Sequence, residues 1–553
     1  MEKDYLSKHY LWKLQNAVRK CWDRKALCNY KGESFTFCDL ATNIEKFHIL
    51  FERSGLKKGD KIAICGRNSS NWAVAFLAAL TYGAVVVPIL HEFKTDNIHN
   101  IINHSDARLV FVSGAIWELI DEENIRSVLG IIQLSDFSIL LSRSEALDTA
   151  RAQIETLFAE RYPTPFGPSD IRYEEPDEEA LAVLNYTSGT SGHAKGVMIP
   201  HRALTSNMQF AYGVVLLNPG DRVVSMLPMA HAYGMSFEFL WEMTLGAHVY
   251  FLTRTPSPKI IHQAFTDVRP NLIVAVPLII EKIIKKGVLP RMGAFPMNVL
   301  VNIPVVNDAV HSSVREQVMR MFGGNFYEVI IGGAGFNKDV ERFLHSIRFP
   351  YTVGYGSTEC APIICYEDWK TARPGSCGKA VINMEVRIDS EDPEHVAGEV
   401  LCRGKNVMLG YYKNEALTRE VLDADGWYHT GDLGIMDSSG RLYIRGRSKN
   451  MILGPSGHNI YPEEIEDVLN TYPYVAESLI VERGNDLVAL VYPDMERVTA
   501  EELSVDALQA VMDKNRKKLN KTLPVYSQIS KITLQAEEFE KTPKKSIKRF
   551  LYQ

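Results

Sequence analysis

Residues 185–201 read NYTSGTSGHAKGVMIPH, and the rest of the chain is organised around them. Within residues 187–196 there are three glycines, four hydroxyl residues and one lysine. Glycine lets a backbone approach a ligand closely and adopt positive φ, while hydroxyl and N–H groups bond phosphate oxygens. Lys195 adds a positive charge. The composition therefore suits a loop that wraps a polyphosphate, although a plain surface turn contains the same residue types.

The residues on both sides of this loop are typical of buried strands. The apolar run LAVLNY at 181–186 precedes it and VMI at 197–199 follows it, so we expect the loop to connect two strands. A Walker A loop ends in Gly-Lys-Ser/Thr, whereas Lys195 follows His193-Ala194 and precedes Gly196. A P-loop nucleotide hydrolase is therefore disfavoured.

Length and composition exclude several classes of protein. A chain of 553 residues exceeds what one core supports, so we expect two or more domains. Hydrophobic residues at 46%, charged residues at 23% and a net charge of -6 describe a globular protein and argue against nucleic acid as a partner. The eight cysteines form no CxxC pair, which favours a reduced, cytoplasmic protein. Residues 71–90 are apolar, but Gly83 and Pro88 divide them into a helix and a strand, each too short to span a membrane.

The pattern along the chain predicts an α/β fold. Strands and helices alternate over residues 30–160 and 222–353, which favours doubly wound parallel sheets. Residues 398–447 change to short strands with glycine at the junctions, which indicates a small antiparallel sheet or barrel. The pattern of helices and strands beyond Ser448 predicts a separate α+β domain. We therefore expect a large domain over 1–447 and a small one over 448–553, with the boundary near Lys449.

Several loops follow predicted strands of the large domain. They are MAHAYG at 229–234, GGAG at 332–335 and GYGSTE at 354–359. Because ligands bind at the carboxyl ends of strands in such sheets, we expect these loops to converge on one crevice.

Five motifs together resemble the adenylate-forming superfamily of acyl-CoA synthetases, luciferases and peptide-synthetase adenylation domains. They are YTSGTSGHAKG, GGAG, GYGSTE, YHTGDLG followed by GRLYIRGRSKN, and SGHNIYPEEIE, and they span nearly the whole chain. The resemblance implies that a carboxylate attacks the α-phosphate of ATP and expels pyrophosphate, with Mg²⁺ offsetting the negative charge. Coenzyme A then attacks the acyl-adenylate and releases AMP.

The resemblance also assigns roles to residues. Glu359 matches the Mg²⁺ ligand, together with Thr190, and Thr358 would bond the α-phosphate. The residues that would hold the β- and γ-phosphates are Thr187, Ser188, Gly189, Thr190, Ser191, Gly192 and Lys195. Tyr355 matches the residue that stacks on adenine, beside Gly356, Gly333, Ala334 and Gly335, and Asp432 matches the carboxylate on the ribose hydroxyls, with Arg447 nearby. The alternatives are an exposed Glu359, a core Tyr355, and plain turns at the glycines and at Asp432.

Further roles concern the second step and the acid. Lys449 falls at the hinge on which the mobile small domain pivots in this superfamily, and Gly457 matches the position that lets the pantetheine arm pass. His231, with Tyr233 and Gly234, would line the carboxylate end of the acyl pocket, the alternative for His231 being a satisfied buried histidine. One departure stands out in KTPKKSIKRF at 541–550, where Ser546 occupies the place of the adenylation lysine. We expect Lys545 or Lys544 to substitute for it. The alternatives are slow adenylation and a lysine-rich tail that is only a solvated surface segment.

The acid expected from the resemblance is a fatty acid. Ala232, Gly234, Met235 and residues 274–279 are small or apolar, and the segments VGYGSTECAP and RPNLIVAVP are most similar to long-chain fatty acid CoA ligases. Two alternatives remain open: an acyl-AMP ligase that loads an acyl carrier protein, and a nucleotide- or acyl-binding pseudoenzyme. A peripheral contact with a membrane is also left open, as is the oligomeric state.

Overall fold

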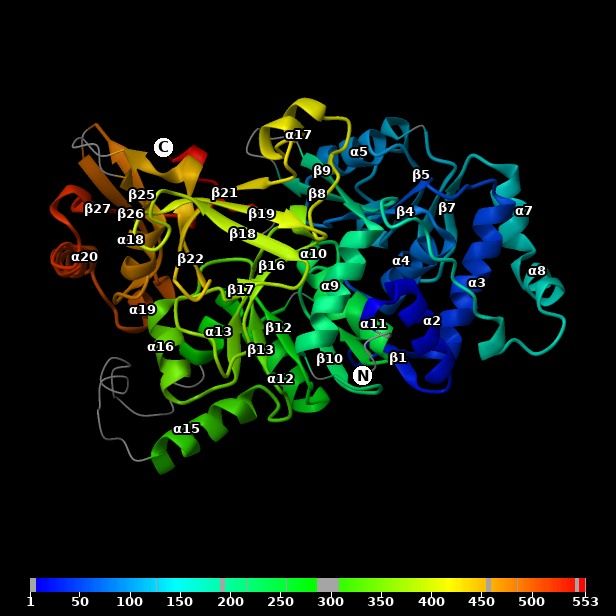
Figure 1. The fold of residues 1–553 in the computed structure, drawn as a ribbon, viewed down its shortest axis with the longest axis horizontal. Helices are drawn as coiled ribbons and strands as arrows, with labels where there is room; N and C mark the ends of the chain where they lie inside the picture. The colour runs from blue at the N-terminus through cyan, green and yellow to red at the C-terminus, as the bar shows by residue number, and fades with distance from the viewer. Residues whose placement is uncertain are drawn as a thin grey trace.

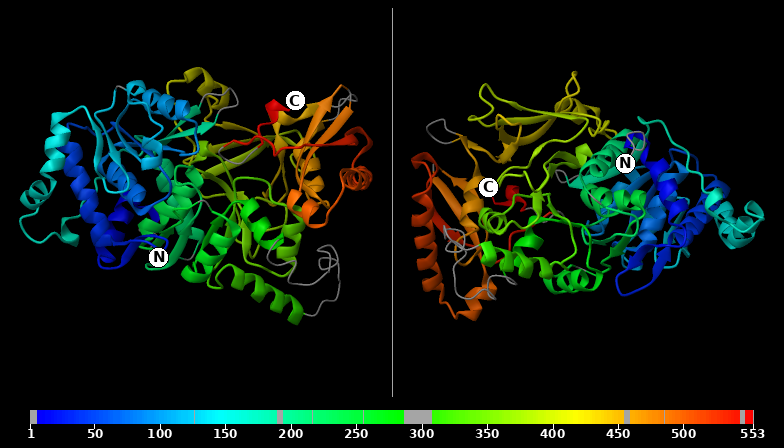
Figure 2. Two further views of the ribbon diagram at one scale, coloured as in Figure 1. Left: turned by 180° about the vertical axis from the view of Figure 1, so that it is seen from behind. Right: turned by 60° about the horizontal axis from the view of Figure 1, so that its bottom comes forward.

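The structure is a computed structural model that describes residues 6–125, 127–188, 194–215, 217–254, 256–285, 308–453, 459–484, 486–542 and 547–552. Figure 1 shows a large body, coloured blue to yellow, with a smaller orange and red part at one end. The views in Figure 2 agree that the small part lies at the end opposite α7 (Glu145–Ala152) and α8 (Ile154–Arg161). The predicted α/β class, with a large first domain and a small last one, is confirmed.

The longest sheet of the described residues carries the glycine-rich loop. Its strands run in the order β20-β9-β8-β4-β3-β5-β6-β7. Their bounds are β3 (Lys61–Cys65), β4 (Val85–Ile89), β5 (Ala107–Val112), β6 (Gly130–Gln133), β7 (Ile139–Ser142), β8 (Leu181–Ser188), β9 (Ala194–Pro200) and β20 (Gly410–Tyr411). The strands from β8 to β6 are parallel, whereas β8 and β9 form an antiparallel pair around the loop, as the flanking apolar runs predict.

The stretch 71–90 forms the expected helix and strand. Helix α4 (Ser70–Tyr82) begins where the Ser69 side chain accepts a hydrogen bond from the Trp72 amide, and it ends at Gly83, which has a φ of 88°. Strand β4 is buried along its whole length, between neighbours on both sides. None of the described helices is long and apolar enough to cross a membrane.

Two further sheets belong to the large domain. One has the order β10-β11-β1-β2, with β10 (Arg222–Ser225), β11 (His248–Phe251), β1 (Lys25–Asn29) and β2 (Ser34–Thr36). The other is parallel, with β12 (Ile273–Ala275), β13 (Val329–Ile331) and β14 (Tyr351–Val353). The helices of the large domain include α2 (Tyr10–Lys20), α3 (Phe37–Arg53), α5 (Thr95–His104), α9 (His201–Val214), α10 (Ala232–Met235), α11 (Trp241–Leu245), α12 (Pro258–Val268), α13 (Pro277–Ile283), α15 (Asp308–Met321) and α16 (Lys338–Ser346). Ala275, Ile331 and Val353 are in register, so the loops after these strands leave from one edge.

The predicted small antiparallel sheet follows. It has the order β18-β19-β21-β22, with β18 (Met384–Asp389), β19 (Gly398–Gly404), β21 (Tyr428–Met436) and β22 (Leu442–Arg447). Beside it lie β15 (Tyr355–Gly356), β16 (Ile363–Tyr366) and β17 (Lys379–Ala380), and α17 (Glu415–Val421) follows β20.

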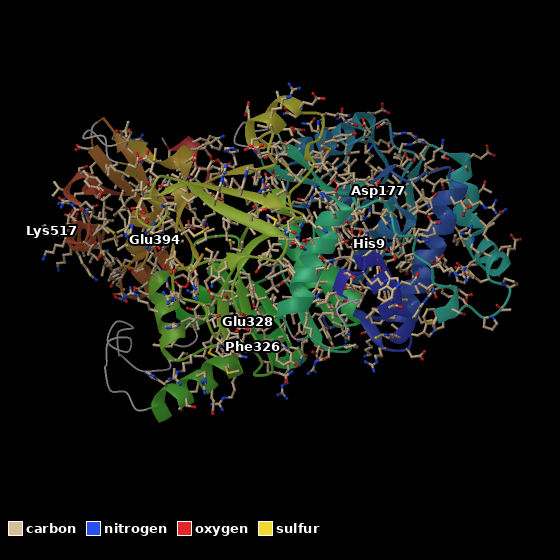
Figure 3. All side chains as sticks on the ribbon, viewed as in Figure 1. His9, Asp177, Phe326, Glu328, Glu394 and Lys517 are labelled. Carbon is tan, nitrogen blue, oxygen red and sulfur yellow. The ribbon has the colours of Figure 1, made fainter. Side chains whose placement is uncertain are left out.

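The small domain has a hydrophobic core of its own. Its elements are β23 (Ile452–Leu453), β24 (Asn459–Ile460), α18 (Pro462–Leu469), β25 (Val475–Arg483), β26 (Asp486–Pro493), α19 (Met495–Ala500), α20 (Val505–Asn520) and β27 (Ile529–Leu534). Ile465, Leu469, Ile480 and Met512 pack together inside it. Lys517 lies on the outer face of α20 and points away from the body (Figure 3). The separate core is what an independent domain requires.

Candidate active site

The loop lysine and the predicted metal ligand meet at one tyrosine. Lys195 lies in β9, directly across the hairpin from Thr187 in β8. Glu359 lies in the 3₁₀ turn Thr358–Cys360, in which Thr358 is buried. The Tyr411 hydroxyl donates a hydrogen bond of 3.0 Å to Glu359 Oε1, and Lys195 Nζ lies 5.4 Å from the centre of the Tyr411 ring. Residues from three separate segments thus form one cluster with a cation and a carboxylate.

The predicted ribose side of the site is a second cluster. Asp432 and Arg447 face each other across β21 and β22, with Arg447 Nε 2.7 Å from Asp432 Oδ1. The Tyr355 hydroxyl donates a hydrogen bond of 2.6 Å to Asp432 Oδ2. Burial raises the pKa of Asp432, and both Arg447 and the Tyr355 hydrogen bond counteract that shift. Tyr355 also packs against the main hydrophobic core, so a structural role and a role against adenine are both compatible with its position.

Tyr428 lies near both clusters. It is 4% exposed and comes from β21, the strand that also carries Asp432. Burial raises the pKa of its phenol, and the negative charge of Glu359 and the neighbouring Tyr411 and Tyr355 raise it further. Sequence reasoning assigned no role to Tyr411, which lies in none of the quoted motifs, or to Tyr428, although Tyr428 is the first residue of YHTGDLG.

The residues predicted for the acyl end surround the short helix α10. His231 caps it, since His231 Nδ1 accepts a hydrogen bond of 3.3 Å from the Tyr233 amide. The Tyr233 hydroxyl donates to the Ile330 carbonyl at 3.1 Å, and a Cβ at Gly332 would lie 3.2 Å from the Tyr233 ring. A Cβ at Gly234 would lie 2.6 Å from the Pro228 carbonyl oxygen, so glycine is required there.

The 332–335 turn also faces the small domain. Gly333 has a φ of 90°, which favours glycine, and Ala334 follows it. A Cβ at Gly335 would lie 3.7 Å from Asp467 Oδ1 in α18. Burial raises the pKa of Asp467 to about 6. The turn therefore lies between the large domain and α18 of the small domain.

The segment around Lys449 connects the two domains. Lys449 is exposed in the 3₁₀ turn Ser448–Asn450 that follows β22. On either side of it, Asn450 Nδ2 donates to Glu463 Oε1 at 2.5 Å, and Arg445 pairs with Glu464 at 2.8 Å. Both glutamates belong to the first turn of α18, so this helix holds the connection in the observed arrangement.

Some predicted residues lie outside the described part of the chain. They are Gly189, Thr190, Ser191, Gly192, Gly457, Lys544, Lys545 and Ser546, and Ser188 is described only as the last residue of β8. The described residues contain no group of three His, Cys, Asp or Glu side chains that could hold a metal. Mg²⁺ commonly binds through one or two carboxylates and substrate phosphates, so a single Glu359 beside a phosphate loop fits this ion better than a dedicated cage does.

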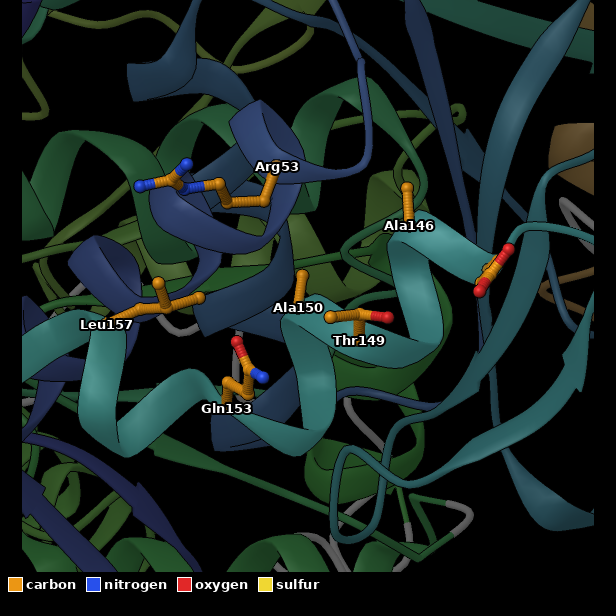
Figure 4. Close-up of a pocket in the computed structure, with 7 residues that line it drawn as sticks. Arg53, Ala146, Thr149, Ala150, Gln153 and Leu157 are labelled. Carbon is orange, nitrogen blue, oxygen red and sulfur yellow. The ribbon is translucent and has the colours of Figure 1, made fainter.

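A cavity of about 430 Å³ lies elsewhere, between the end of α3 and helices α7 and α8 (Figure 4). Its lining includes Arg53, Thr149 and Leu157, and no residue predicted for the site contributes to it. The clusters around Tyr411 and Asp432 are therefore the candidate active site.

Sequence alignments with related proteins cover most of the chain. It is 28% identical over 496 residues to a long-chain-fatty-acid–CoA ligase of Escherichia coli O157:H7, covering 84% of this chain and 81% of the relative. It is 25% identical over 519 residues to 4-coumarate–CoA ligase 3 of Oryza sativa subsp. japonica, covering 91% of this chain and 84% of the relative.

Solved structures show the same fold. The anthranilate CoA ligase AuaEII in complex with anthranoyl-AMP aligns with a TM-score of 0.77 at 18% identity, covering 100% of this chain and 98% of the other. ATP-bound MatB from Rhodopseudomonas palustris aligns with a TM-score of 0.74 at 19% identity, covering 99% and 98%.

Two family models account for nearly all of the sequence. The model of AMP-binding enzymes matches residues 14–412, and the model of the AMP-binding enzyme C-terminal domain matches residues 449–552. The resemblance drawn from the five motifs is thereby confirmed, and the chain belongs to the AMP-binding enzyme family.

Proposed function

We propose that the protein joins a carboxylic acid to coenzyme A through an acyl-adenylate. The observation that carries this proposal is the arrangement of Lys195 and Glu359 on Tyr411, with Asp432, Arg447 and Tyr355 in a second cluster, in a chain of this family. The first cluster suits phosphates and the second suits a nucleoside. The names of the relatives, which are CoA ligases of several acids, support the same reaction.

In the first step a carboxylate oxygen attacks the α-phosphate of ATP, and the bond from that phosphorus to pyrophosphate breaks. Lys195 and the loop hydroxyls would bind the β- and γ-phosphates, and Thr358 would bond the α-phosphate. Glu359 with Thr190 would hold Mg²⁺, which would neutralise part of the charge on the phosphates. Asp432 would accept hydrogen bonds from the ribose hydroxyls, with Arg447 beside it.

In the second step the thiol of coenzyme A attacks the acyl carbonyl, and AMP leaves. We place the pivot of the small domain at Lys449, because Arg445 on the large-domain side pairs with Glu464 of α18, and this ion pair would have to change when the small domain turns. Gly457 would admit the pantetheine arm. Lys545 would supply the cation for adenylation that Ser546 cannot supply.

A fatty acid, and a long-chain one, is the proposed substrate. The E. coli relative named for that activity supports it, and so do the small and apolar residues Ala232, Gly234 and Met235 of α10. Another relative is named as a 4-coumarate–CoA ligase, so an aromatic acid belongs in the test. The second candidate for the acceptor is an acyl carrier protein in place of coenzyme A.

We place the protein in a reducing compartment such as the cytoplasm, and its eight free cysteines support this location.

The experiment is a panel of fatty acids from short to long chains, with 4-coumarate included, in which AMP and pyrophosphate are measured with ATP, Mg²⁺ and coenzyme A. We expect release with long-chain acids and its loss in Glu359→Ala. Lys544→Ala and Lys545→Ala, tested side by side, identify which lysine replaces Ser546. Tight ATP binding without turnover of any carboxylate contradicts the proposal, and product only with a holo-carrier protein selects the second candidate.

A further inference from the structure

A short strand far along the chain pairs with β9, the strand that follows the glycine-rich loop. Strand β20 pairs antiparallel with β9, and Tyr411 is opposite Val197. The Tyr412 amide donates to the Gly196 carbonyl at 2.8 Å, one residue after the loop lysine. The backbone of Tyr411 is thus fixed to the end of the loop.

The position of Tyr411 is constrained from its other side as well. Its amide donates to Thr418 Oγ1 in α17 at 2.9 Å. Gly410 has a φ of 138°, and a Cβ there would lie 2.6 Å from Thr418 Cγ2. Residue 410 must therefore be glycine for the strand and α17 to pack as they do, and this packing directs the next side chain into the site.

The Tyr411 side chain contacts both charged groups of the first cluster. It is 6% exposed, its hydroxyl donates to Glu359 Oε1, and Lys195 Nζ lies over its ring. A phenol hydroxyl donates one hydrogen bond, and a carboxylate oxygen accepts it.

We propose that Tyr411 is a positioning residue that orients the Glu359 carboxylate for Mg²⁺ and the Lys195 ammonium for the phosphates. The hydrogen bond fixes one carboxylate oxygen and leaves the other oxygen for a cation. The ring face attracts the ammonium group and places it on the same side chain. This inference rests on the proposed function, because it concerns the binding of ATP with Mg²⁺.

The neighbouring Tyr412 provides a matched control. Its hydroxyl donates to Asp106 Oδ2 at 2.8 Å, and Lys413 pairs with the same carboxylate. Both tyrosines thus bond a carboxylate, but Asp106 belongs to the segment after α5 and has no proposed role. Loss of either hydroxyl removes one hydrogen bond to a charged group, and only one of the two bonds involves the site.

The test compares Tyr411→Phe with Tyr412→Phe by isothermal titration of ATP, with Mg²⁺ and with EDTA, in the absence of acid and coenzyme A. A hydrogen bond to a charged group corresponds to about a tenfold change in binding. We expect Tyr411→Phe to weaken ATP binding about tenfold with Mg²⁺ and to leave it unchanged with EDTA. Tyr412→Phe should keep the wild-type response to Mg²⁺, and melting temperatures should fall by similar amounts in both.

A double-mutant cycle separates positioning from general stability. If Tyr411 acts through Glu359, Tyr411→Phe has no further effect on ATP binding in a Glu359→Ala background. An equal additional loss in that background overturns the inference, and so does the same Mg²⁺ response in both tyrosine variants. If the wild type does not bind ATP with Mg²⁺ at all, the proposed function fails first, and the two failures are therefore distinguishable.

Discussion

Replacing Gly356 by alanine should displace the strand pair that carries Tyr355, a residue of the candidate active site. Gly356 pairs with Ile363 across β15 and β16. A Cβ at this position would lie 2.0 Å from the Pro362 carbonyl oxygen and 2.9 Å from the Pro362 carbonyl carbon. Both atoms belong to the backbone, so no side-chain rotation can relieve the clash. The two strands must separate by about 1.4 Å to bring the 2.0 Å contact to 3.4 Å, which is an ordinary distance.

The separation of β15 and β16 in Gly356→Ala should lower both the stability and the activity of the protein. Overpacking of this size lowers the free energy of unfolding by about 1–3 kcal/mol. Tyr355 immediately precedes Gly356, and Thr358 and Glu359 follow in the next turn, so all three move with the strand. Misplacement by about 1 Å reduces the rate of a reaction about 100-fold. We therefore expect Gly356→Ala to fold with reduced stability and to lose about 100-fold in pyrophosphate release.

Gly354→Ala is the matched control in the same loop. A Cβ there would lie 3.4 Å from Ile363 Cδ1 and 3.6 Å from the Cys365 carbonyl oxygen, which are ordinary contacts. Pyrophosphate release with ATP, Mg²⁺ and a fatty acid is measured for both variants, together with urea denaturation. If Gly356→Ala retains activity within a factor of about two of Gly354→Ala, the close contact with Pro362 does not govern the site and the reasoning is refuted.

Three other variants test separate parts of the structure. Burial raises the pKa of Glu242 from 4.5 to about 8, so the native state holds a proton that the unfolded chain releases. Between these pH values the free energy of unfolding falls by about 1.4 kcal/mol per pH unit as the pH rises, because the native state must keep or lose this proton at a cost. Glu242→Gln should remove this pH dependence when the free energy of unfolding is measured by urea denaturation. An unchanged pH dependence contradicts the raised pKa of Glu242. Asp432→Asn should weaken AMP binding about tenfold in calorimetric titrations, because Arg447 loses its charged partner at 2.7 Å; unchanged affinity would rule out the ribose role. Lys449→Ala should leave pyrophosphate release unchanged and slow thioester formation, whereas equal loss of both steps argues against a hinge.

Local patterns in the sequence were sufficient to predict most elements. The apolar runs on both sides of the glycine-rich loop form the hairpin of β8 and β9, and the break at Gly83 ends α4 as expected. The helix and strands of the small domain also follow from periodicity, because that domain buries its own core. These features depend on neighbours in sequence, which is the information that a single chain provides.

Contacts between distant segments could not be predicted in the same way. Tyr411 reaches Glu359 because a two-residue strand pairs with β9, and a strand of that length has no recognisable period. The bond between Tyr355 and Asp432 joins residues 77 positions apart. The buried Glu242 belongs to an apolar helix, and no described residue hydrogen-bonds either of its carboxyl oxygens. The family resemblance indicated Glu359, Tyr355 and Asp432 individually, but their partners depend on tertiary structure.

The carboxylates of the two clusters already have hydrogen-bond partners within the protein. Asp432 is held at one oxygen by Arg447 and at the other by Tyr355, and Glu359 is held by Tyr411. A carboxylate has about four positions at which it accepts hydrogen bonds, so Asp432 can accept ribose hydroxyls without releasing either partner. A nucleotide would then add to the existing contacts instead of replacing them, and little side-chain entropy would be lost on binding. Because Asp432→Asn removes a charge at the centre of these contacts, it should loosen Tyr355 and Arg447 together, and the effects of Tyr355→Phe and Asp432→Asn on AMP binding should be less than additive.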